Sequence, residues 1–96
     1  MLEQFDHSAG KPGMGTDAKS ITGPQLRAAR SLVGVTGEEL AAITRLALAT
    51  IRRAEQDGTA KMTYANAERL MQALEALGVV FLARDETGGP GVRLVR

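Results

Sequence analysis

The stretch that decides the fold is TGEELAAITRLALATIRRAEQ, which runs from Thr36 to Gln56. It opens with a capping box, because Thr36 is a good N-cap and Glu39 stands three residues later. Each of these side chains can then bond a free main-chain N–H of the other residue. The helical spacing of apolar residues breaks near Arg45 and resumes after it. Because two helices this short bury little surface alone, the stretch predicts a pair of helices, joined by a tight turn, inside a larger helical core.

The second helix of this pair has two different faces. Ile51 and Ala54 share one face, whereas Arg52, Arg53 and Gln56 share another. This separation predicts that the helix packs its apolar face inward and presents a basic face to the outside.

A further helix is expected before this stretch. Thr22 and Gln25 form a second capping box with Pro24 in the first turn, where its missing N–H costs nothing. Gly34 is placed to end the helix as a left-handed C-cap. Arg30 shares a face with apolar residues, and a charge buried there needs an acidic partner.

A last helix is expected from about Tyr64 to Leu77, with Thr63 as its cap and Gly78 as its stop. Its apolar stripe has helical spacing and consists of Ala67, Leu70, Leu74 and Leu77. Of this stripe, Leu70 and Leu74 are assigned to the core.

The character of the chain changes over residues 79–96. A short apolar, β-branched run, Val79–Ala83, is followed by a turn-rich segment and then by Val92 and Leu94 alternating with Arg93, which predicts a β-hairpin. A two-stranded hairpin is marginal alone in water. Its apolar residues must therefore pack on the helices, or its edge must pair with another chain. We expect pairing with a second copy, so that the hairpin is a dimerisation element.

Composition excludes several classes of protein. The 96 residues contain no cysteine, and the net charge is only +1, which is low for a protein that lives on nucleic acid. The one histidine, His7, lies near the N-terminus, and no pair of carboxylates converges, so neither an enzyme nor a metal or other cofactor is expected. No apolar run approaches the roughly 20 residues that span a bilayer, and no signal peptide is recognised. A cytoplasmic protein without membrane contact is expected.

The first 20 residues are predicted to be a flexible tail. Glycines and a proline interrupt them, and no helical or strand period is sustained. Lys11 and Lys19 could touch a phosphate backbone, although a solvated tail is the favoured interpretation. Order is expected to begin at Ile21.

With these elements in place, residues 22–78 resemble the Cro/C1-type (XRE-like) helix-turn-helix domain of phage repressors and small bacterial regulators. Gly37 matches the first residue of the motif and Ala41 its obligatory small position, and the run Ala49–Glu55 is similar to the family's recognition-helix consensus. The apolar positions of the motif are filled by Leu40, Leu46, Ile51 and Ala54. The resemblance implies a mainly α fold: a four-helix domain over residues 21–78, followed by the C-terminal β-hairpin.

The resemblance also implies a function and its residues. In this family the second helix of the motif lies in the major groove of double-stranded DNA. The positions that match base-facing residues are Ala47, Leu48, Ala49, Thr50 and Arg53. Arg53 is the strongest candidate, since an arginine can hydrogen-bond O6 and N7 of guanine together. The positions that match phosphate contacts are Arg52, Gln56, Lys61 and the main-chain N–H groups at Gly37. The family's buried ion pair would be formed here by Arg30 and Glu55.

These implications describe a sequence-specific transcriptional regulator, expected to be a repressor. It would bind as a homodimer to an inverted-repeat operator, with half-sites about 34 Å apart.

The chain departs from the family pattern at four positions. Arg45 stands where the tight turn usually has glycine, Gly37 replaces a polar residue, Ala47 replaces a Ser or Thr cap, and Ile43 occupies a position that is usually polar. A second interpretation is favoured by the near-neutral charge, by apolar Ile43 and Leu48, and by Gly37 and Ala47. The alternative is a protein-interaction module on the same scaffold, such as an antitoxin or an anti-activator that binds another regulator. A continuous basic stripe along the second helix would favour DNA, and an apolar patch there would favour a protein partner.

Overall fold

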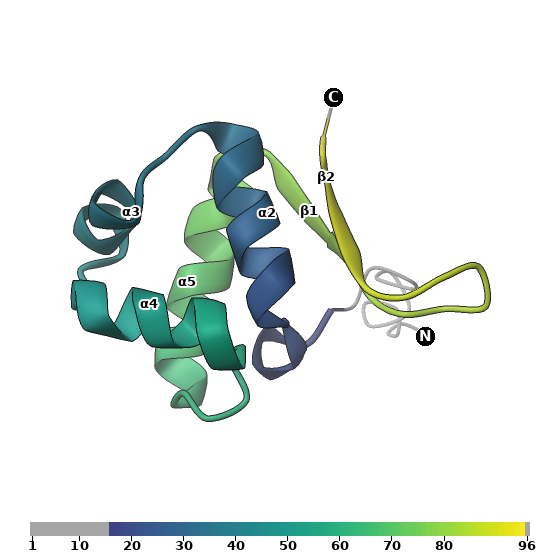
Figure 1. Cartoon of the computed structure of the whole chain (residues 1–96), viewed down its shortest axis with the longest axis horizontal. Coiled ribbons are helices and arrows are strands. Elements are labelled where there is room, and N and C mark those ends of the chain that lie inside the picture. The colour runs from purple at the N-terminus through teal and green to yellow at the C-terminus, as the bar shows by residue number, and fades with distance from the viewer. Residues whose placement is uncertain (1–15, 96) are drawn as a thin grey trace, which may run out of the picture.

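The computed structural model of the chain describes residues 16–95 (Figure 1). The elements in chain order are η2 (Ala18–Ser20), α2 (Gly23–Val33), α3 (Gly37–Thr44), α4 (Leu48–Asp57), α5 (Tyr64–Ala76), β1 (Val79–Leu82) and β2 (Gly91–Leu94). The four α-helices gather on one side, and the hairpin extends away from them. The prediction of a mainly helical fold with a C-terminal β-hairpin is confirmed. Within the described part of the chain, no helix is both long and apolar enough to cross a membrane.

The helices begin and end where the sequence signals predict. Reciprocal capping boxes open α2 at Thr22 and α3 at Thr36, and the Thr63 hydroxyl accepts a hydrogen bond from the N–H of Asn66 at the start of α5. Gly34 ends α2 with a φ of 71°, in the left-handed region that favours glycine. Local side-chain chemistry therefore fixes these boundaries.

One apolar core joins the helices to the hairpin. Each of the four helices contributes to it, and Val79 and Phe81 of β1 belong to the same cluster at 2% exposure each. The helical members include Leu26, Leu40, Ile51, Leu70 and Leu74. The inner face of β1 is therefore buried by the helices, which gives the hairpin the packing that an isolated hairpin lacks.

Gln25 fixes the hairpin to α2. The strands are antiparallel, and their last pair is Leu82 with Gly91. The side-chain amide of Gln25, which is 4% exposed, donates to the carbonyls of Leu82 (3.2 Å) and Gly91 (3.0 Å). It thus satisfies both strands where they separate, while its Oε1 accepts from the N–H of Thr22 at 2.8 Å.

The predicted flexible tail extends too far into the chain. Residues 16–20 pack on the domain: Ala18 is 3% exposed, and its carbonyl accepts a hydrogen bond from the buried hydroxyl of Thr59. The Thr16 hydroxyl donates to the carbonyl of Phe81 at 3.0 Å. The prediction was wrong for these five residues because their partners lie far along the chain. Residues 1–15, which include His7 and Lys11, lie outside the described residues.

Helix α2 approaches α4 so closely that only glycine fits at Gly23. A Cβ added at this residue would lie 2.3 Å from the main-chain oxygen of Glu55. The same addition at Gly37, the first residue of α3, would meet only the side chain of Leu48, at 3.4 Å. Two glycines in equivalent helix positions therefore tolerate a methyl group very differently.

We expect Gly23→Ala to lower the free energy of unfolding by about 2 kcal/mol or more, because the backbones of two helices must separate. Gly37→Ala is the matched control and should stay within about 0.5 kcal/mol of the parent protein. Urea unfolding followed by far-UV circular dichroism measures both values. Equal effects of the two substitutions would contradict the close approach.

A second prediction concerns Arg45, which has a φ of 62° and is the one non-glycine residue with positive φ in residues 16–95. A side chain in this conformation costs roughly 1 kcal/mol. Arg45→Gly should therefore stabilise the protein by up to about 1 kcal/mol, less the extra freedom that glycine gives the unfolded chain. Arg45→Ala keeps the Cβ and should leave stability nearly unchanged. If the alanine variant gains as much as the glycine variant, backbone strain is not the cause.

Candidate nucleic-acid interface

The turn between α3 and α4 is supported by Thr44. Its hydroxyl, buried at 2% exposure, donates to the carbonyl of Leu40 at 2.8 Å and accepts from the N–H of Leu46 at 3.3 Å. Arg45 then reverses the chain in the left-handed conformation. The turn therefore has the geometry that glycine would favour, although an arginine occupies it.

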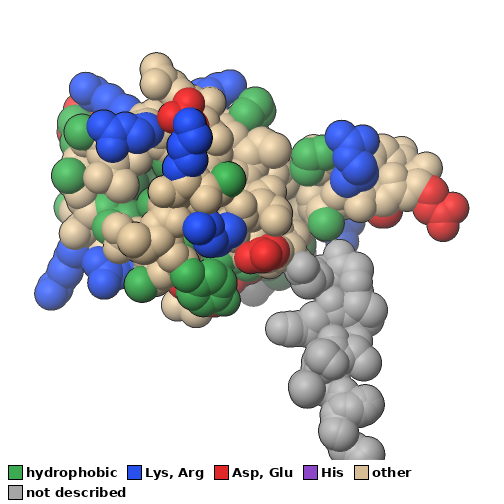
Figure 2. Space-filling view, turned by 90° about the horizontal axis from the view of Figure 1, so that it is seen from below, with side chains coloured by type: hydrophobic (Ala, Val, Ile, Leu, Met, Phe, Trp, Pro, Cys, Tyr) green, Lys and Arg blue, Asp and Glu red, His purple; other side chains and the backbone are tan. Residues whose placement is uncertain are grey.

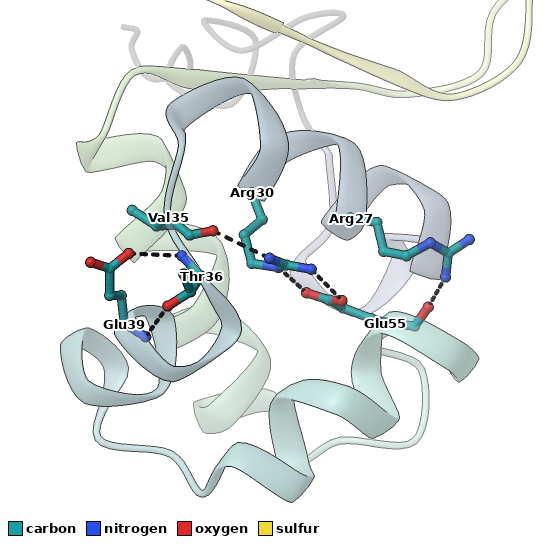
Figure 3. Close-up of polar contacts among 6 residues, drawn as sticks. All are labelled: Arg27, Arg30, Val35, Thr36, Glu39 and Glu55. Atoms are coloured by element: carbon teal, nitrogen blue, oxygen red, sulfur yellow. Dashed lines mark hydrogen bonds and ion pairs between the residues drawn. The ribbon is translucent and has the colours of Figure 1, made fainter.

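Helix α4 is held against α2 by an ion pair (Figure 3). The Arg30 guanidinium reaches both oxygens of Glu55, at 2.6 Å from Nε and 3.2 Å from Nη2. It also donates to the carbonyl of Val35 at 3.3 Å, and Arg27 donates to the main-chain oxygen of Glu55. The pairing of Arg30 with Glu55, which the family resemblance implied, is present. The hydrogen bond to Glu55 raises the pKa of Arg30 against the opposing effect of burial, so the guanidinium stays charged.

This attachment leaves one side of α4 facing outward. The helix buries Ile51 and Ala54 at 1% and 2% exposure. The exposed side is the one predicted from the sequence and carries Ala49, Arg52, Arg53 and Gln56. Among the described residues, no hydrogen bond or ion pair engages the Arg53 side chain, which is therefore available for a ligand.

Three of the predicted residues line one shallow hollow between α4 and the start of α5. Its volume is about 250 Å³, and Thr50, Arg53 and Lys61 contribute to its wall. The Asp57 carboxylate also lines it, together with Asn66 in the first turn of α5. Two cations and several hydrogen-bonding groups therefore converge here, with one acidic group among them.

Three other predicted residues, Ala47, Leu48 and Arg52, are placed less favourably for binding DNA through their side chains. Leu48 is half-buried and lies against Gly37, so only part of its side chain is free to contact a base. Ala47 is the N-cap of α4 and makes no side-chain cap hydrogen bond. Arg52 lies 3.8 Å from the Glu38 carboxylate, although both side chains are 69% exposed.

The charged side chains on the face of the molecule that carries α4 do not form one continuous patch. Figure 2 shows Lys and Arg side chains in separate groups over the helical part, with acidic side chains among them. Hydrophobic side chains on this face are also scattered. Ile43 of α3 is 51% exposed. This face therefore carries individual basic side chains rather than a continuous basic stripe.

Sequence reasoning missed Asn66 and Arg27. Asn66 joins the hollow only because α5 begins beside the end of α4, and its place in the first turn after the Thr63 cap was the available signal. Arg27 lies one turn before Arg30 on α2 and contacts the same residue of α4. Its helical spacing from Arg30 could have indicated this shared contact.

No protein-family model, curated protein sequence or solved structure matches this chain. Within residues 16–95, no cluster of acidic or histidine side chains is arranged to hold a metal ion.

We predict that the Arg30–Glu55 pair contributes substantially to stability. Glu55→Ala should lower the free energy of unfolding by about 2 kcal/mol, because it leaves a partly buried guanidinium without its carboxylate. A double-mutant cycle with Arg30→Ala isolates the coupling, which should exceed about 1 kcal/mol. The matched cycle on Arg52 and Glu38 should give less than about 0.5 kcal/mol, since that pair is exposed and long. Similar coupling energies in the two cycles would contradict this difference.

Proposed function

We propose that the chain is a Cro/C1-type (XRE-like) DNA-binding transcriptional regulator that acts through α4. The observation that carries the proposal is the attachment of α4. Its inner side is fixed by Ile51, Ala54 and the Glu55–Arg30 pair, while its outer side remains exposed. A rigid helix with a free polar side, preceded by a short helix and a tight turn, suits insertion into the major groove.

Arg53 is proposed to read sequence. It is exposed near the middle of the outer side of α4, and no acidic side chain pairs with it among the described residues. A guanidinium in the major groove can donate to O6 and N7 of one guanine. Ala49 and Leu48 lie nearer the start of the helix and offer only apolar contact, which suits the methyl group of thymine.

The phosphate backbone is proposed to be bound on both sides of this helix. Lys61 follows α4 in the loop and lines the same hollow as Arg53, while Arg52 and Gln56 lie on the exposed side of the helix. Gly37 begins α3, where main-chain N–H groups have no partner within the helix. These groups would position α4, and Arg53 would supply discrimination between bases.

The proposed active form is a homodimer that binds an inverted repeat and represses by occupancy. Two copies related by a twofold axis place two α4 helices on one side of the duplex. Successive major grooves on that side lie about 34 Å apart, which sets the half-site spacing.

A second candidate is a protein-interaction module, such as an antitoxin or anti-activator. Two observations favour it: Ile43 is 51% exposed, and the Glu38 carboxylate lies 3.8 Å from Arg52, where it would oppose a phosphate. In this case α3 and its exposed Ile43 would contact another regulator, and Ile43→Ser would weaken that contact without affecting the fold.

The deciding measurement is the affinity of the purified protein for labelled duplex DNA by fluorescence anisotropy, over about 50 to 200 mM salt. Affinity should fall steeply as the salt concentration rises. Protein binding releases cations that are condensed on the DNA phosphates, and added salt opposes this release. Arg53→Ala should weaken binding about tenfold or more, which corresponds to the loss of one arginine–base contact.

The matched control is Arg84→Ala. Arg84 is exposed on the hairpin, so its substitution removes the same charge away from α4 and should leave affinity nearly unchanged. Absence of binding at the lowest salt would exclude the DNA-binding proposal in favour of the protein-interaction module. Equal losses in the two variants would show that Arg53 acts only through net charge.

A further inference from the structure

The turn between α3 and α4 carries an arginine in a conformation that the described chain otherwise gives to glycine. Arg45 has a φ of 62°, whereas the other residues with positive φ in residues 16–95 are Gly34, Gly58 and Gly78. A side chain held in the left-handed region is strained, and strained residues of this kind gather at functional sites. This outlier makes the Arg45 side chain a candidate for a functional contact.

No contact within the described fold occupies the Arg45 side chain. It is exposed, and no hydrogen bond or ion pair engages it among residues 16–95. The turn itself is supported by other groups, since the Thr44 hydroxyl bonds the carbonyl of Leu40 and the N–H of Leu46. The fold therefore uses the main chain of Arg45 and leaves its guanidinium free for a ligand.

Arg45 lies beside the N-terminal end of α4. It stands two residues before the N-cap Ala47, so the Cα atoms of these two residues are no more than about 8 Å apart. Ala47, Leu48 and Ala49 have apolar side chains that cannot bind a phosphate. Arg45 is therefore the basic residue nearest in sequence to this end of the helix, where the proposed interface has no charged anchor of its own.

Arg45 is also distant from the phosphate contact proposed at Gly37. Helix α3 begins at Gly37, and Arg45 is its C-cap, so a rise of about 1.5 Å per residue places the two ends about 12 Å apart. That separation is about the width of the major groove. The two ends of α3 can therefore contact different phosphates, and a contact from Arg45 adds to the one at Gly37.

We propose that Arg45 binds a DNA phosphate beside the N-terminal end of α4, in addition to the contacts proposed for Arg52, Gln56 and Lys61. This inference rests on the proposed function and assigns a role to a residue that departs from the family pattern. A guanidinium can donate two parallel hydrogen bonds to one phosphate. Arg45 positions α4 in the groove in this way and contributes no discrimination between bases.

The salt dependence of DNA affinity distinguishes a phosphate contact from a structural effect. Arg45→Ala should weaken binding to generic duplex DNA roughly fivefold to tenfold near 100 mM salt, because about one fewer counterion is released. The ratio of parent affinity to variant affinity should fall by about half when the salt concentration is doubled. Arg45→Lys keeps the charge and should retain most of the affinity and the parent's salt slope. Arg84→Ala is the matched control and should leave both quantities nearly unchanged.

A second comparison sets stability against affinity. Arg45→Gly relieves the backbone strain and should unfold at a urea concentration equal to or above that of the parent, yet it should bind DNA as weakly as Arg45→Ala. A stabilising substitution that weakens binding is expected where a strained residue serves a ligand. The alternative is that the charge only favours the C-terminal end of α3. In that case Arg45→Ala would be less stable than the parent, and its affinity would be unchanged.

Affinity of Arg45→Ala equal to that of Arg84→Ala, or a ratio to the parent that is the same at every salt concentration, would overturn the proposal. Unequal losses on duplexes of different sequence would overturn it as well, because a phosphate contact weakens binding to all sequences alike. These outcomes differ from failure of the proposed function. A parent protein that binds no DNA at the lowest salt removes both proposals, whereas binding that depends on Arg53 and not on Arg45 removes this contact alone.

Discussion

The position of α4 against α2 is the constraint on which the remaining structure depends. Two contacts set it: the close approach of Gly23 to the main chain of Glu55, and the ion pair from Arg30 to the Glu55 side chain. One residue of α4 is thus fixed through both its backbone and its carboxylate. Because α4 is short, two contacts near its C-terminal end, together with the burial of Ile51, define which side faces outward.

The same helix α2 also orients the hairpin. Its first turn supplies Gln25, whose amide satisfies the carbonyls of both strands. α2 therefore contacts α4 on one side and the hairpin on another, so that it links the candidate DNA-binding helix to the candidate dimerisation element. In the proposed dimer, the separation of the two α4 helices would follow from this rigid connection rather than from a flexible linker.

The two edges of the hairpin differ because residues 16–18, whose composition predicts no structure, contact β1 and not β2. Thr16 and Ala18 have no local pattern that indicates order, yet they are held by Phe81 and Thr59. The consequence is an asymmetry: the N-terminal segment covers β1, and β2 remains free.

Local chemistry in the sequence determined the helix boundaries, the outward residues of α4 and the existence of the hairpin. Capping boxes, a left-handed glycine and helical spacing act over a few residues, so they can be read without tertiary structure. The partner of Arg30 was predicted only through the family resemblance, because a contact across 25 residues leaves no local signal. The tertiary structure alone decided that Arg53 and Lys61 share a hollow with Asn66, that Leu48 is partly covered, that Gln25 holds both strands, and that one edge of the hairpin is closed. Each of these depends on which distant segments pack together, and that is set by the burial of the whole apolar core rather than by any single stretch of sequence.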